Sequence, residues 1–204
     1  MSRMRDRILC SVEQAILAAQ ALKNDDSVSF MENCAHKIAD CLQSGGKLMI
    51  AGNGGSLCDA MHFAEELSGL YREKRPALAA MALSDQGLMS CIANDIGYDK
   101  VFARGVEALG KKEDIFIALT TSGNSANLIE AVSSAKAKGM QTIAFLGRSG
   151  GKMKGMCDLE FIVDGFPYSD RVQEAHMAAI HIIIEMVEGR LFPELCVKEE
   201  MCCT

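Results

Sequence analysis

The chain has no long hydrophobic run and no excess of basic residues, and each lack excludes a class of protein. The longest apolar stretch, residues 178–184, contains His181 and is far shorter than the about 20 apolar residues that span a bilayer. The net charge is −6, and Lys and Arg are spread along the 204 residues, so neither nucleic acid nor a membrane surface is an expected partner. Loops and helix ends must therefore hold any anionic ligand.

The chain also lacks a disulfide framework. Its nine cysteines are an odd number without repeating spacing, which favours reduced thiols in a cytoplasmic protein. No secretory signal is expected, because Glu13 interrupts the apolar segment that follows the N-terminal arginines. Cys202 and Cys203 lie in a short tail, residues 196–204, where they can be exposed thiols, metal ligands or a bridge between chains.

Residues 1–195 are predicted to form a single α/β domain. Apolar positions at spacings of three and four predict two helices, residues 4–22 and 27–42, within an N-terminal extension of residues 1–44. These helices are extra to a minimal fold, so we expect their apolar faces both to cover the sheet and to meet another subunit. Short apolar runs then predict five strands, with helical segments between and after them, at residues 48–51, 78–83, 114–119, 141–146 and 159–163.

Strands that alternate with helices imply right-handed crossovers and a parallel sheet with helices on both faces. We predict the strand order 2-1-3-4-5. In such sheets ligands bind at the carboxyl ends of the strands where the order reverses, here between the first and third strands. The loops at that point are Gly52 to Ser56 and Thr120 to Ser125.

The first of these loops is rich in glycine. Gly52, Asn53, Gly54 and Gly55 follow an apolar strand, and glycines permit positive φ and a close approach of a ligand to the main chain. Ser56 is predicted to be the N-cap of the next helix. The free N–H groups at that helix start suit a phosphate. The loop is not a nucleotide P-loop, because it lacks the Lys-Ser/Thr ending.

The second loop is rich in hydroxyl groups. Thr120, Thr121, Ser122 and Ser125 precede the helix at residues 126–138, and Gly123 permits an unusual φ. A phosphate monoester could be bound there without Lys or Arg. The alternative is an ordinary strand-to-helix turn, which needs one capping hydroxyl rather than four.

His62 and Glu66 lie four residues apart on the helix after the glycine loop, so their side chains share one face. A histidine and a carboxylate so placed can share a metal, although this spacing is also common among ordinary surface residues. His181 has apolar neighbours on both sides, and the residues alone favour a hydrogen-bonded core histidine.

Five segments together resemble the bacterial phosphoheptose isomerases, which are sugar-isomerase (SIS) domain proteins. The segments are AGNGGSLCDAMHFAEELSG from Ala51, SDQGLMSCIAND from Ser84, TTSGNSAN from Thr120, GGKM from Gly150 and DRVQEAHMAAIH from Asp170. The resemblance implies conversion of sedoheptulose 7-phosphate to D-glycero-D-manno-heptose 7-phosphate, the first step towards nucleotide-activated heptose for surface polysaccharide such as lipopolysaccharide. It also implies a cytoplasmic homotetramer with one zinc ion per subunit and active sites near the subunit interfaces.

The resemblance assigns roles by motif. It makes Glu66 and His181 the acid/base pair and His62, Glu66, Gln173 and His181 the zinc ligands. It gives the sugar-phosphate contacts as Asn53, Gly54, Gly55, Asn94, Asp95, Thr120, Thr121, Ser122, Ser125, Asp170 and Gln173. One zinc can join Gln173 to His181 only if both side chains lean towards it, because eight residues of helix rise about 12 Å.

One departure from the family pattern affects the expected site. Leu70 stands where many relatives have arginine, so Arg72 or Arg75 would have to replace that group if it contacts substrate. Two other functions stay open at this point. One is a non-catalytic SIS-domain adaptor that binds the DNA-replication initiator, and the other is isomerisation of another phosphosugar such as arabinose 5-phosphate, whose enzymes usually have appended regulatory domains.

Overall fold

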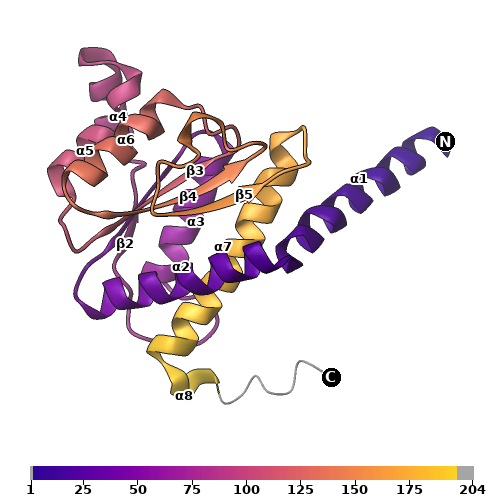
Figure 1. The fold of residues 1–204 in the computed structure, drawn as a ribbon, viewed down its shortest axis with the longest axis horizontal. Coiled ribbons are helices and arrows are strands. Elements are labelled where there is room, and N and C mark those ends of the chain that lie inside the picture. The colour runs from indigo at the N-terminus through magenta and orange to yellow at the C-terminus, as the bar shows by residue number, and fades with distance from the viewer. Residues whose placement is uncertain (1, 197–204) are drawn as a thin grey trace.

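A computed structural model of the protein describes residues 2–196 (Figure 1). Residues 197–204 of the predicted tail, including Cys202 and Cys203, lie outside the described residues. The helices are α1 (Ser2–Gln20), α2 (Asp25–Gln43), α3 (Gly55–Ser68), α4 (Gln86–Asp95), α5 (Ala103–Leu109), α6 (Ala126–Ala137), α7 (Ser169–Leu191) and α8 (Pro193–Cys196). The strands are β1 (Leu48–Gly52), β2 (Ala80–Ala82), β3 (Ile115–Thr120), β4 (Gln141–Gly147) and β5 (Leu159–Val163).

The five strands form one parallel sheet in the order β2-β1-β3-β4-β5, which confirms the predicted order. In register, Leu48 of β1 stands opposite Ala80 on one side and Ile115 on the other. Every residue of β1 and β3 is buried, because helices cover both faces of the sheet. This double burial is why these strands read as continuous apolar runs.

The second strand is shorter than predicted. Pairing with β1 is confined to Ala80–Ala82, whereas the apolar run extends over residues 78–83. At the start of that run, the backbone N–H of Leu78 donates to the carbonyl of Leu67 at the end of α3, at 3.0 Å. An edge strand has a partner on one side only, so a neighbouring helix end can take its terminal hydrogen bonds.

Successive strand residues face two separate cores. Leu48 and Ile50 pack with α2, α3 and α7 on one face, while Met49 and Ala51 pack with α4, α5 and α6 on the other. This alternation follows from the two-residue period of a strand. Figure 1 shows the resulting layers, with α4, α5 and α6 on one side of the sheet and α2, α3 and α7 on the other.

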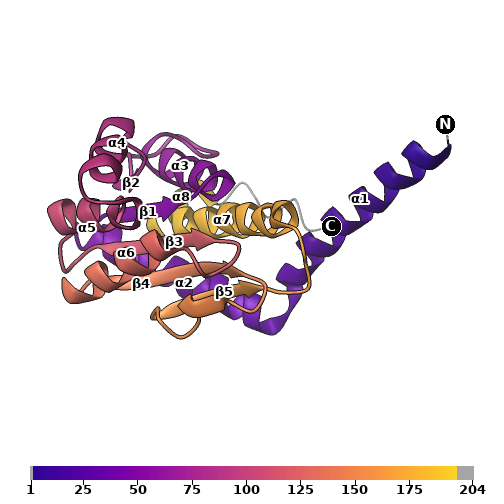
Figure 2. The ribbon, with the colours of Figure 1, turned by 90° about the horizontal axis from the view of Figure 1, so that it is seen from above.

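The two N-terminal helices have different surroundings. The α2 residues Phe30, Cys34 and Ile38 are buried against the sheet beside α7. By contrast, most of α1 projects away from the rest of the chain in both views (Figures 1 and 2). Ala18 of α1 is buried, but large apolar side chains earlier in this helix are 44% to 73% exposed, namely Met4, Ile8, Leu9, Val12, Ile16 and Leu17.

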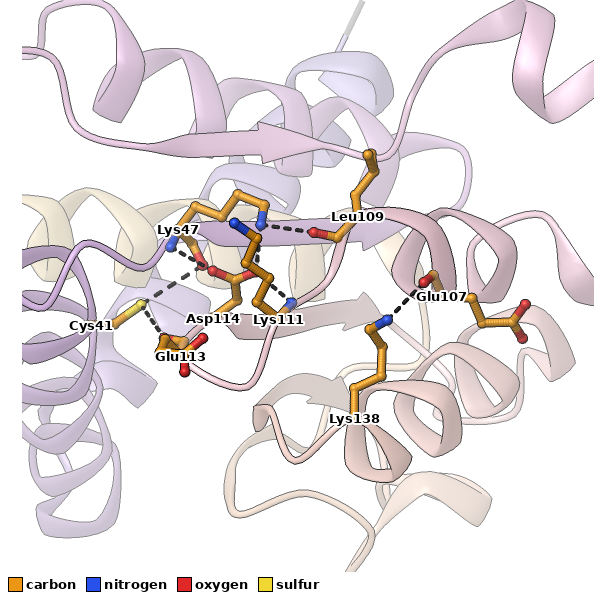
Figure 3. Close-up of polar contacts among 8 residues, drawn as sticks. All are labelled: Cys41, Lys47, Glu107, Leu109, Lys111, Glu113, Asp114 and Lys138. Carbon is orange, nitrogen blue, oxygen red and sulfur yellow. Dashed lines mark hydrogen bonds and ion pairs between the residues drawn. The ribbon is translucent and has the colours of Figure 1, made fainter.

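An ionic network fixes the amino-terminal edge of the sheet (Figure 3). Asp114 pairs with the ammonium group of Lys47 and accepts the backbone N–H groups of Lys47 (3.0 Å) and Lys111 (2.8 Å). Burial alone would raise the pKa of Asp114, but these hydrogen bonds lower it below its usual value. The buried charge of Asp114 is therefore satisfied by partners from the segments before β1 and β3. Among the described helices, none is long and apolar enough to cross a membrane.

Candidate functional site

A small polar cavity lies at the carboxyl ends of β1 and β3, at the predicted reversal of strand order. Its volume is about 190 Å³. Both predicted ligand loops contribute to it, together with the start of α7. The lining residues are Asn53, Ser56, Leu119, Thr120, Thr121, Ser122, Ser125, Ser169 and Gln173.

The glycine loop brings α3 close to α7. Gly54, with φ +57°, is the N-cap of α3, and the helix begins at Gly55, so the prediction that Ser56 is the N-cap is wrong. Ser56 lies inside the first turn, buried, with its Oγ 3.5 Å from the Nε2 of Gln173. A Cβ on Gly55 would lie 2.6 Å from that same nitrogen. A side chain at position 55 would therefore displace the Gln173 amide from its place beside Ser56.

The hydroxyl loop has a fixed backbone and hydroxyl groups directed to the cavity. Thr120 Oγ1 accepts the Gly123 N–H at 3.2 Å, and Gly123 has φ +64°. A Cβ on Gly123 would stand only 1.8 Å from the carbonyl oxygen of Gly150, so the loop cannot accept alanine unchanged. Ser125 occupies the N-cap position of α6 but makes no side-chain capping bond. This differs from the ordinary capped turn and leaves the Ser125 hydroxyl available for a ligand.

Side-chain amides fix the position of Asn53 beside the cavity. Asn53 and Asn127 exchange two hydrogen bonds, of 3.0 and 2.8 Å, and the hydroxyl of Tyr98 donates to Asn53 Oδ1 at 3.3 Å. Asn127 and Ser169 were not among the predicted site residues. An asparagine in the first turn of α6 and a serine at the start of α7 are common helix-terminal residues, so sequence alone gave no reason to select them.

A second cluster joins α3 to α7. One ligand atom each from His62, Glu66 and His181 lies within 4.8 Å of the others. His62 Nε2 is 3.0 Å from Glu66 Oε1, and the His62 and His181 ring centroids are 5.1 Å apart. Tyr71 stacks on His181, with ring centroids 5.9 Å apart and planes inclined by 25°.

His181 is not the buried core histidine that its apolar neighbours favoured. It is half-buried and faces the cluster, and burial and then the nearby His62 lower its pKa. A neutral imidazole is therefore favoured, which is the form that binds a metal. The core histidine of α7 is His176, which is fully buried with Nε2 3.0 Å from the carbonyl oxygen of Leu146.

The cluster suits a divalent transition metal. Two imidazole nitrogens and one carboxylate oxygen are a common ligand set of zinc, and such sites keep a fourth position for a further ligand. Gln173 lines the cavity near Ser56, eight residues before His181 in α7. Its predicted role as the fourth ligand stays a prediction.

Five predicted contact residues lie outside the cavity lining, namely Gly54 and Gly55 of the glycine loop and, further away in the chain, Asn94, Asp95 and Asp170. Asn94 and Asp95 are exposed at the end of α4, where the Asn94 amide donates to Asp95 Oδ1 at 2.7 Å. Asp170 is exposed and accepts the backbone N–H of Arg171 at 2.9 Å. Their contact with substrate stays a prediction.

The arginines near Leu70 have distinct surroundings. The side chain of Arg75 is fully buried, with Nε 2.6 Å from Glu188 Oε1, so Arg75 cannot replace a substrate-binding arginine. Arg72 is partly exposed, 3.0 Å from Glu185, and its guanidinium lies 5.2 Å from the centre of the Tyr71 ring. Arg72 lies over the ring of Tyr71, which in turn stacks on His181 of the cluster.

Comparisons with known proteins identify the family. The family profile of the SIS domain matches residues 13–147. A curated phosphoheptose isomerase of Vibrio cholerae is 52% identical over 88% of this chain and 94% of its own length. The chain belongs to the phosphoheptose isomerase family. Solved phosphoheptose isomerases from Neisseria gonorrhoeae (37% identity, 91% of this chain and 99% of that one) and Francisella tularensis (32%, 90% and 97%) both superpose with a TM-score of 0.85.

As a member of the phosphoheptose isomerases, the chain is an isomerase enzyme. Membership favours catalysis over the alternative of an adaptor for a replication initiator. The described structure agrees with that choice, since both the polar cavity and the His62–Glu66–His181 cluster are fully formed.

Proposed function

We propose that the enzyme converts sedoheptulose 7-phosphate to D-glycero-D-manno-heptose 7-phosphate by aldose–ketose isomerisation. The phosphate would bind in the cavity at the strand ends, and the carbonyl end of the sugar would reach the His62–Glu66–His181 cluster. The names and close similarity of the relatives support this substrate.

One observation carries the proposal: the cavity and the cluster lie along the same two helices. Ser56 and Gln173 line the cavity near the starts of α3 and α7, and His62 and His181 follow on the same helices. The offsets of six and eight residues correspond to about 9 and 12 Å of helix. An extended seven-carbon sugar phosphate spans a distance of this order, so both ends of one molecule can be bound at once.

Glu66 and His181 would carry the proton transfers. The Glu66 carboxylate removes the proton from the carbon beside the carbonyl, which gives an enediolate, and His181 delivers a proton to the neighbouring carbon and takes up the one that Glu66 holds. The hydroxyl proton of the enediolate passes from the first oxygen to the second, so that both side chains return to their starting forms. The cavity keeps the phosphate at a fixed distance, so that the same carbon always faces Glu66.

We propose that His62, Glu66 and His181, with Gln173, hold one zinc ion per subunit. When bound, zinc would supply Lewis-acid stabilisation of the negative charge that develops on the sugar oxygens. The ligand atoms of the three clustered residues, within 4.8 Å of one another, need little movement to surround an ion with bonds of about 2.0–2.2 Å.

The test is to incubate the purified protein with sedoheptulose 7-phosphate and to follow the sugar by NMR. We expect the aldose signal to appear, and chelation to lower the rate more than about 100-fold, since Lewis-acid stabilisation contributes several kcal/mol. Addition of zinc should restore the rate, with magnesium as the control ion. No aldose with wild-type protein would refute the proposed function, whereas full activity after chelation would remove only the metal.

We also propose that the enzyme is a homotetramer in which α1 packs against other subunits, with the active sites near the interfaces. A projecting helix with a stripe of exposed apolar side chains is unstable alone in water, and apolar patches of this kind mark association sites. Residues 1–195 would form its single-domain subunit. The cytoplasm and the supply of activated heptose for polysaccharide such as lipopolysaccharide are the proposed setting.

Charges on the apolar stripe of α1 should separate the subunits. With Ile8→Glu and Val12→Glu combined, the mass measured by size exclusion with light scattering is expected to fall below that of a tetramer, because carboxylates would be buried without partners. Gln14→Glu, on the opposite side of the helix, adds charge without touching the stripe and should leave the mass unchanged. An unchanged mass in the double variant would contradict the role of α1.

A further inference from the structure

Ser169 lies where a ligand phosphate would bind, although no role was predicted for it. It lines the cavity together with five other hydroxyl residues, Ser56, Thr120, Thr121, Ser122 and Ser125. The cavity volume of 190 Å³ equals roughly six waters at about 30 Å³ each, which suits a phosphate group but not a whole sugar phosphate. Ser169 is thus part of the wall around the phosphate end of the substrate.

The hydroxyl of Ser169 is hydrogen-bonded to that of Thr121, and this pair keeps one hydroxyl proton that it can donate to an anion. Thr121 Oγ1 and Ser169 Oγ are 3.1 Å apart, and the two residues come from segments 48 positions apart in the chain. A hydroxyl group has one proton and two acceptor sites, so a pair of hydroxyls uses one proton internally and keeps the other free. If the pair opens when phosphate enters, both protons become available to its oxygens.

Ser169 also places a third helix start beside the cavity. It is the first residue of α7, and Tyr168 before it makes no side-chain capping bond. In this first turn Asp170 Oδ1 accepts the N–H of Arg171, and the helix start is otherwise without a capping side chain. Ser56 of α3 and Ser125 of α6 stand at the other two helix starts. The positive ends of three helix dipoles therefore converge on a cavity whose lining has no Lys or Arg.

The backbone around Ser169 is held in place by neighbouring loops. Arg148, a non-glycine residue with φ +55°, donates from its side chain to the carbonyl of Pro167 at 3.1 Å and from its N–H to Val163 at 2.9 Å. A Cβ on Gly147 would lie 2.6 Å from the carbonyl oxygen of Thr121 and 2.7 Å from Val172, so the end of β4, the hydroxyl loop and α7 are in direct contact. These contacts fix the backbone that leads to Ser169.

We infer that Ser169 is a further phosphate-binding residue, which contributes its hydroxyl and the start of α7 to the anion site. The inference rests on the proposed function for its sugar substrate, but the binding of phosphate itself is independent of turnover. Removal of a hydrogen bond to a charged group is expected to weaken binding roughly ten-fold or more.

The test compares Ser169→Ala with Ser169→Thr and with Ser133→Ala, an exposed hydroxyl deletion on α6 far from the cavity lining. Inorganic phosphate is the probe, and its dissociation constant is measured by calorimetry and as a competitive inhibition constant. Ser169→Ala should raise both constants and the KM for sedoheptulose 7-phosphate roughly ten-fold, with a smaller change in kcat. Ser169→Thr should keep values near wild type, and Ser133→Ala should match wild type.

A negative charge introduced at position 169 provides a second test. Ser169→Asp should abolish phosphate binding while the thermal midpoint stays close to that of wild type, since an acidic residue in the first turn is compatible with α7. Unchanged phosphate constants in Ser169→Ala, or intact phosphate binding in Ser169→Asp, would overturn the inference. If wild-type protein binds phosphate but does not isomerise the heptulose, the proposed function fails and the anion site remains.

Discussion

Replacement of Glu66 by glutamine is expected to lower kcat by about 10²- to 10⁴-fold, the contribution typical of a general acid or base. The amide has nearly the same shape as the carboxylate but cannot accept a proton from carbon. The carboxylate of Glu66 lies 3.0 Å from His62 and belongs to the cluster that also contains His181. Single-turnover kinetics with sedoheptulose 7-phosphate measure the effect on the chemical step directly.

Two controls separate proton transfer from other effects of this change. Glu65→Gln alters the neighbouring residue, whose side chain is 66% exposed and 3.7 Å from His62, and should change kcat by less than about two-fold. The zinc content of Glu66→Gln, measured by mass spectrometry, shows whether the metal is still bound. Normal turnover in Glu66→Gln would refute the assignment of Glu66 as the base.

The sheet could be predicted because its signals are local. Leu48 to Ala51 and Ile115 to Leu119 are apolar without interruption, which requires burial on both faces, and the intervening helices then leave few possible topologies. Element ends were less predictable. Ser56 has the residue type of an N-cap, yet the N-cap lies two residues earlier, at Gly54, and Gly55 of the first turn packs against Gln173 of α7. That neighbour cannot be seen in the local sequence.

The candidate site shows the same limit. His62 and Glu66 are one turn apart in one helix, so their proximity follows from spacing alone, whereas their approach to His181 depends on how α3 packs against α7. Tyr71 and Ser169 gave no signal of their own, because a tyrosine or a serine near a helix end is ordinary. Only their contacts in the folded protein identify them: Tyr71 stacks on the His181 ring, and Ser169 is hydrogen-bonded to the Thr121 hydroxyl.

Arg75 connects the fold to the site. Its guanidinium donates to the carbonyl oxygens of Glu66 and Leu67 at the end of α3, each at 2.7 Å, and it pairs with Glu188 of α7. A planar group with five donors can satisfy a carboxylate and two carbonyls together, which lysine cannot do. Arg75 therefore ties together the two helices that carry His62, Glu66 and His181.

Replacement of Arg75 by alanine should lower the free energy of unfolding by about 3–5 kcal/mol, because Glu188 would be left as a buried charge without its partner. The side chains are only 0% and 9% exposed, so water cannot replace the guanidinium without rearrangement. For a chain of this length the midpoint of thermal unfolding should fall by roughly 10 °C. Arg72→Ala, which removes a partly exposed ion pair to the same helix, should cost no more than about 1 kcal/mol.

A double variant identifies the source of the loss. If the unpaired carboxylate dominates, Arg75→Met combined with Glu188→Leu should be markedly more stable than Arg75→Ala, since apolar residues of similar size often replace a buried ion pair at little cost. If the hydrogen bonds to the Glu66 and Leu67 carbonyls dominate, the double variant should be as unstable as the single one, because both carbonyls still lose their donor. A stability of Arg75→Ala within 1 kcal/mol of wild type would contradict both accounts and the role of Arg75 as the link between α3 and α7.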